Sequence, residues 1–298
     1  MDESVLLSAL RHSSASRRAS GLEALCGLES SVFQSLILRL LGSEYRDVRE
    51  GVLALCSVET LKEPGFREHL VAWVSDGEVF EPLVRQGLLV LISRLEGALE
   101  DALAAYYRRC FDDVDGDVRY QAFWVAELRN EEGEDYLTRV RAGTKSKDED
   151  LRILASQAIC RLRPSWGEEA LAEQARYALG LEAFHVLLAR LTLGDAVLRL
   201  SLEPSLLAYL GDERFVYPAI LALRDYGTEA CVEGLLRVAG SFLAEPTVRV
   251  AAAEAAARHG SEKGRSLLVA FSNKRGGNPS YAAEALLALD GDGMKGEG

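Results

Sequence analysis

The chain has 298 residues, with 34 Lys plus Arg against 46 Asp plus Glu, so its formal net charge is −12. A hydrophobic fraction of 48% with 27% charged residues is typical of globular proteins and excludes a disordered chain. The acidic balance disfavours a protein that coats nucleic acid and a basic protein of membrane surfaces.

Residues that favour helices dominate the sequence. Long stretches of Ala, Leu, Arg and Glu accompany only 7 prolines and 7% aromatic residues, so we expect an all-α protein. No basic segment precedes an apolar run near Met1, and no apolar stretch approaches the roughly 20 residues of a membrane helix. Five widely spaced cysteines without a C-x-x-C pair disfavour disulfides and zinc. We therefore expect a soluble, cytoplasmic protein.

A short motif recurs along the chain. It reads Asp-Val-Arg at Asp47 and Asp117 and Asp-Leu-Arg at Asp150. Alignment on its arginine gives nine equivalent positions with a mean spacing of 33 residues: Arg18, Arg49, Arg85, Arg119, Arg152, Ala183, Val216, Arg249 and Ala282. A fixed period of this length is typical of helical repeat proteins.

Each copy is predicted to form two helices. The first, helix A, is expected at Val32–Leu41, Leu99–Phe111, Leu171–Leu179 and Val232–Leu243, among others. The second, helix B, begins near the motif and carries apolar or small residues on one face at a 3.6-residue period. The residues predicted to start B helices are Asp47, Asp117 and Asp150 as caps and Pro82, Pro246 and Pro279 as first-turn prolines.

The repeated run resembles the HEAT-repeat family, in its shorter bacterial form. The match is clearest at Val248–Ala255 and Leu151–Ala158, while the signatures of ankyrin and tetratricopeptide repeats are missing. This resemblance implies an all-α, right-handed α-solenoid of about nine stacked helix-turn-helix repeats. We expect one repeat domain over residues 1–289 and a disordered, Gly-rich acidic tail over residues 290–298.

Patterns that carry chemistry are weak. Some HEAT-like enzymes, the deoxyhypusine hydroxylases, bind iron through His-Glu pairs, and this sequence has none. The Asp112–Asp117 loop lacks the glycine and the glutamate of a calcium loop, because Val118 and Trp124 stand at those positions. Cys26, Cys56 and Cys160 recur at one seam and are expected to be buried. We therefore predict no enzyme, no cofactor and no metal.

One face of the B helices is not explained by the core. Offsets +1, +5 and +8 from the register position point away from the stack and should line the concave side of the solenoid. The residues predicted to bind a protein partner there are Tyr120, Trp124, Glu127, Ile153, Gln157, Phe184, Leu188, Tyr217, Leu221 and Arg224. The alternative is that the B helices are rotated about their axes by about 40° from this assignment, which would pack Trp124 or Phe184 against a neighbouring helix.

A second hypothesis uses arginine. A row of arginines ends successive B helices and forms a candidate edge for phosphate-bearing or acidic ligands: Arg94, Arg129, Arg161, Arg190, Arg224 and Arg258. An arginine in the last turn of a helix is also favoured by the helix dipole, and the net charge disfavours nucleic acid. The main prediction is a non-catalytic scaffold or adaptor for a protein partner, with its oligomeric state and its membership of a larger complex left open.

Overall fold

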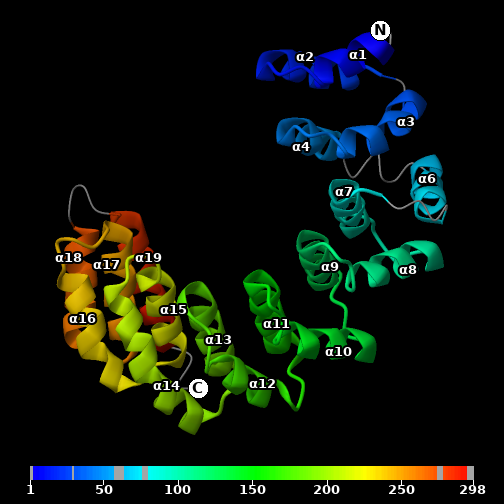
Figure 1. Cartoon of the computed structure of the whole chain (residues 1–298). Helices are drawn as coiled ribbons and strands as arrows, with labels where there is room; N and C mark the ends of the chain where they lie inside the picture. The colour runs from blue at the N-terminus through cyan, green and yellow to red at the C-terminus, as the bar shows by residue number, and fades with distance from the viewer. Residues whose placement is uncertain (1–2, 29, 57–63, 76–79, 274–277, 294–298) are drawn as a thin grey trace. The chain divides into compact units, whose positions relative to one another are not determined.

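The computed structural model describes residues 3–28, 30–56, 64–75, 80–273 and 278–293. Throughout these ranges the chain forms helices joined by turns, without a β-strand, which confirms the all-α prediction (Figure 1). It divides into two compact units, residues 1–154 and 155–298, and the boundary lies inside one helix. Both units are built from consecutive α-helices. The single repeat domain over residues 1–289 stays a prediction.

The helices follow one another in pairs along the sequence. In chain order they are α1 (Glu3–Leu10), α2 (Ala15–Leu25), α3 (Ser30–Leu41), α4 (Arg46–Leu55), α6 (Pro64–Ser75), α7 (Pro82–Ser93), α8 (Asp101–Cys110), α9 (Gly116–Leu128), α10 (Glu134–Gly143) and α11 (Glu149–Leu162). They continue with α12 (Gly167–Gln174), α13 (Gly180–Leu193), α14 (Ala196–Ala208), α15 (Val216–Tyr226), α16 (Val232–Gly240), α17 (Pro246–Arg258), α18 (Glu262–Ser272) and α19 (Pro279–Gly293). Two 3₁₀ turns, Tyr209–Gly211 and Glu229–Cys231, interrupt the second half.

The C-terminal end differs from the prediction. Residues 290–293 belong to α19, although we expected the disordered tail to begin at residue 290. A helix that starts with Pro279 at its first turn continues through the glycines at its end. Residues 294–298, the rest of the predicted tail, lie outside the described residues.

The B helices start partly as predicted. Pro82 and Pro246 occupy the first turns of α7 and α17, where a missing N–H has no cost. The cap of α9 is Asp115, whose carboxylate accepts the N–H of Val118 at 3.0 Å, rather than Asp117. Asp47 is not at the N-cap position of α4, which Tyr45 occupies, but its carboxylate accepts the first-turn N–H of Val48 at 3.0 Å and also binds the guanidinium of Arg18 in the preceding repeat at 2.9 Å.

The register arginines tie each turn to its helix B. A guanidinium Nη1 donates to the carbonyl of the residue six positions earlier, in the turn between helices A and B. The contacts are Arg49 to Ser43 at 2.7 Å, Arg119 to Asp113 at 2.7 Å and Arg152 to Ser146 at 2.8 Å. In these repeats the motif arginine thus supplies a donor to a part-buried carbonyl of the turn.

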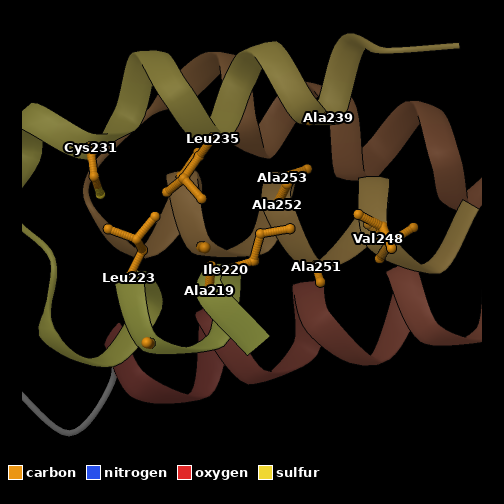
Figure 2. Packing of buried hydrophobic residues seen from close by; sticks show 14 of the residues in the cluster. Ala219, Ile220, Leu223, Cys231, Leu235, Ala239, Val248, Ala251, Ala252 and Ala253 are labelled. Atoms are coloured by element: carbon orange, nitrogen blue, oxygen red, sulfur yellow. The ribbon is translucent and has the colours of Figure 1, made fainter. Parts of the chain in front are cut away.

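Helix α17 forms the centre of the second unit. Figure 2 shows its Val248 and Ala251–Ala253 beside Ile220 and Leu223 of α15 and Leu235 of α16. Every α17 side chain from Val250 to Ala256 is buried, as expected for a helix covered on all sides. Small side chains allow this close packing, and a Cβ added at Gly264 of α18 would lie 2.8 Å from the backbone nitrogen of Ala257.

Three aromatic rings fill the space between α13 and the following repeat. Phe184 lies with its ring centroid 4.9 Å from that of Tyr209 and 4.9 Å from that of Phe215. Tyr209 ends α14 and Phe215 precedes α15, so the cluster joins a helix to the turn of the next repeat. Phe184 is 3% exposed and belongs to the hydrophobic core.

Candidate functional site

In the first unit, large side chains lie exposed along α9. Trp124 is 37% exposed and Leu128 is 51% exposed, while Tyr120 is half-buried. These three residues follow one another at four-residue spacing, so they share one face of the helix. We call Tyr120, Trp124 and Leu128 the α9 stripe.

The opposite face of α9 fixes the orientation of the stripe. Val118, Ala122 and Val125 are fully buried there, which anchors the helix in the core. Glu127, another predicted site residue, accepts a hydrogen bond from the hydroxyl of Tyr136 on α10 at 2.7 Å. The stripe is thus presented by a helix held on its inner face and tied to its neighbour.

Leu128 was not among the predicted residues. It lies at offset +9, one position beyond the offsets considered, and only its spacing from Trp124 signalled it. Ile153, in contrast, was predicted to be exposed and is 7% exposed, so that prediction is wrong. The reason is that α11 is buried around most of its circumference here, with Leu151, Leu154 and Ala155 also buried.

In the second unit, the predicted residues divide into exposed and buried ones. Tyr217 of α15 is 40% exposed and Gln157 is exposed, whereas Leu188 and Leu221 are half-buried. Phe184 is the clear correction, because the rings of the next repeat cover it. Phe184 thus packs against neighbouring residues, as the alternative foresaw, whereas Trp124 stays partly exposed.

A buried carboxylate joins three helices of this unit. Glu254 of α17 is 5% exposed and receives the guanidinium of Arg258 at 3.1 Å and that of Arg224 at 3.9 Å. The hydroxyl of Tyr281 on α19 donates to it at 3.4 Å. Burial, and after it the charge of Glu254 and the contact with Tyr217, raise the pKa of Tyr281 to about 12. Sequence reasoning missed this cluster, since Glu254 stands in a run of alanines.

The arginines of the candidate edge are engaged within the protein. Arg94 of α7 donates to the carbonyls of Leu53 and Cys56, at the end of α4. Arg129 of α9 donates in the same way to the carbonyls of Leu95 and Gly97, at 2.9 and 2.6 Å. These two guanidinium groups donate to carbonyls at the end of α4 and in the segment that follows α7.

The other arginines of the row have acidic or internal partners. Arg190 binds the carboxylate of Glu168 at 2.7 Å, and Arg224 and Arg258 share Glu254. Arg161 is also engaged. The row is thus explained by contacts within the fold, which weakens the hypothesis of an anion-binding edge.

Other chemistry finds little support in the described residues. No group of three or more His, Cys, Asp or Glu side chains among them is arranged to hold a metal ion. Asp113 of the acidic loop instead pairs with Arg85 at 2.8 Å. Burial raises the pKa of Cys56 and Cys110 to about 12, while Cys26 is exposed, contrary to the prediction for its seam. No described helix has the length and apolar character that crossing a bilayer requires.

Comparisons with known proteins agree with the fold. No family model and no curated protein matches the sequence. Among solved structures, a chain of the complex in which Kap95p binding induces the switch loops of RanGDP to adopt the GTP-bound conformation is similar, with a TM-score of 0.50 and 17% identity. The match covers 96% of this chain and 45% of that chain. At this identity the likeness shows the fold alone, an array of consecutive α-helices.

Proposed function

We propose that this chain is a non-catalytic scaffold or adaptor that binds a protein partner on the inner face of its B helices. The observation that carries the proposal is the exposure of Trp124 and Tyr217. Both are large aromatic residues at offsets, +5 for Trp124 and +1 for Tyr217, that the repeat pattern assigns to the inner, concave face. Exposed aromatic side chains on rigid helices are typical anchors of protein interfaces.

The proposal includes the finer features of the fold. We infer about nine repeats, because the register at 33-residue spacing extends from Arg18 to Ala282, and the resemblance to HEAT repeats implies a right-handed solenoid. The solved neighbour is itself part of a complex between proteins, which supports a protein partner here. Five free cysteines fit a reducing compartment such as the cytoplasm. Both a free adaptor and a subunit of a larger complex agree with such a surface.

The test compares exposed aromatic residues with exposed aliphatic ones. Trp124→Ser and Tyr217→Ser should each lose partners that the wild-type chain captures after crosslinking, as measured by quantitative mass spectrometry. Val5→Ser and Val197→Ser are the matched controls, because Val5 on α1 is 58% exposed and Val197 on α14 is 77% exposed. The valine variants should melt close to the wild type, since surface substitutions change stability by only about 0.5 kcal/mol, and the aromatic variants should lose about 1 kcal/mol or less.

Two outcomes contradict the proposal. Capture of the same proteins by wild type, Trp124→Ser and Tyr217→Ser would show that the B-helix face is not the binding surface. Equal losses in the Val5→Ser and Val197→Ser controls would show that general surface hydrophobicity, rather than the aromatic anchors, accounts for capture.

A further inference from the structure

The negative charge of the chain is concentrated in one unit. Residues 1–154 hold 28 of the 46 acidic residues but only 19 of the 34 basic ones, a net charge of −9. Residues 155–298 hold the remaining 18 and 15, a net charge of −3. The α9 stripe therefore lies in the strongly acidic unit.

Carboxylates lie at both ends of the stripe. Asp117, in the first turn of α9, is exposed and precedes Tyr120 and Trp124 by three and seven residues, which places it on the same face of the helix. Glu132, also exposed, lies in the turn that follows α9, beyond the left-handed Asn130. Along α9 the face therefore reads carboxylate, two aromatic rings and leucine, and a second carboxylate follows in the turn.

Nearby guanidinium groups do not neutralise these two carboxylates. Arg119 donates to the backbone carbonyls of Asp113 and Val114. Arg129 donates to carbonyls at the end of α7. Arg139 pairs with other acidic residues, Asp112 and Asp135, at 2.8 and 3.3 Å. The polar ends of the stripe thus present negative charge to a ligand.

We propose that the α9 stripe binds a basic amphipathic segment of a protein partner. This inference rests on the proposed function and names the chemistry of the partner. Apolar side chains of the segment contact Trp124 and Leu128, and its Lys or Arg side chains pair with Asp117 and Glu132. The helix face from Asp117 to Leu128, which contains the α9 stripe, is about 16 Å long, or about three helical turns. The charge of −9 repels nucleic acid and anionic lipid and so favours a protein segment.

The test uses a defined probe in place of the unidentified partner. The probe is a fluorescein-labelled synthetic helix of leucine and lysine with one apolar face, and its comparator has glutamate in place of every lysine. Binding to the 298-residue chain is measured by fluorescence anisotropy. We expect the lysine peptide to bind and the glutamate peptide not to bind.

Variants separate specific contact from general attraction. Trp124→Ser should raise the dissociation constant of the lysine peptide at least about tenfold, as for a central aromatic anchor. Asp117→Asn should raise it about two- to fivefold and reduce its dependence on salt. Val5→Ser, in the same unit, should leave it unchanged. Circular dichroism should show the same melting curve for all of these proteins.

The outcomes distinguish this inference from the proposed function. Equal binding of both peptides, or equal binding of the lysine peptide to Trp124→Ser and Val5→Ser, overturns the inference. If the peptide result is negative while Trp124→Ser still loses its captured partners, only the basic chemistry is wrong. If capture is also insensitive to Trp124, both proposals are wrong.

Discussion

Replacing Phe184 by alanine should destabilise the second unit by about 3–5 kcal/mol. The side chain is 3% exposed, and two aromatic rings lie 4.9 Å away, so the change removes a whole ring from a packed cluster. Aromatic pairs at such distances add about 0.5–1.5 kcal/mol beyond the area that they bury. Tyr209 and Phe215 cannot both move to fill the space, because each closes the turn between α14 and α15.

Urea unfolding and thermal melts of the full chain, followed by circular dichroism, measure this effect. At about 2–4 °C per kcal/mol for a unit of this size, we expect a loss of about 6–20 °C in Tm. Tyr217→Ala is the matched control, because its ring was predicted on the same face but is 40% exposed; it should cost about 1 kcal/mol or less. A Phe184→Ala protein with wild-type stability and lost partner binding would refute this reasoning and return Phe184 to the binding surface.

Three further predictions follow from single groups. Asp113→Ala should cost about 3 kcal/mol in urea unfolding, because it leaves the largely buried Arg85 unpaired, whereas Asp117→Ala at an exposed position should change little. Burial lowers the pKa of His185 below 6.5, so as the pH falls the unfolded chain takes up this proton before the folded chain does. The free energy of unfolding should therefore decrease as the pH drops below about 6.5. His185→Asn should reduce this pH dependence of stability, and an unchanged pH dependence would contradict the prediction. Ellman's reagent at pH 8 should modify Cys26 rapidly and the other four thiols slowly, because burial raises their pKa; two fast equivalents in the native protein would be inconsistent with this.

The repeat register was predictable because its chemistry is local. Pro82 and Pro246 start helices where the sequence placed them, and the register arginines Arg49, Arg119 and Arg152 each bind a turn carbonyl six residues before them. The N-cap residue is harder to predict from sequence, because each of the alternating aspartates in the loop before α9 has a carboxylate that can accept a first-turn N–H. Asp115 is the one that reaches the N–H of Val118.

Exposure on the B-helix face could be predicted only in part. Helical periodicity places Trp124, Tyr217 and Phe184 on equivalent faces, but it contains no information on what the next repeat brings to that face. Phe184 is covered by residues 25 and 31 positions later in the chain, a contact that a single helix pattern cannot encode. The burial of Glu254 likewise depends on arginine and tyrosine from neighbouring helices.

The alanine surface of α17 has a mechanical consequence. Alanine has no rotamers to exchange, and the backbone of α18 approaches that of α17 at Gly264 without an intervening side chain. Sliding or tilting of one helix over another is normally absorbed by side chains that reorient between them, and here few are available. The C-terminal helices should therefore deform as one stiff block, so any change of shape that accompanies binding must be accommodated by other parts of the chain.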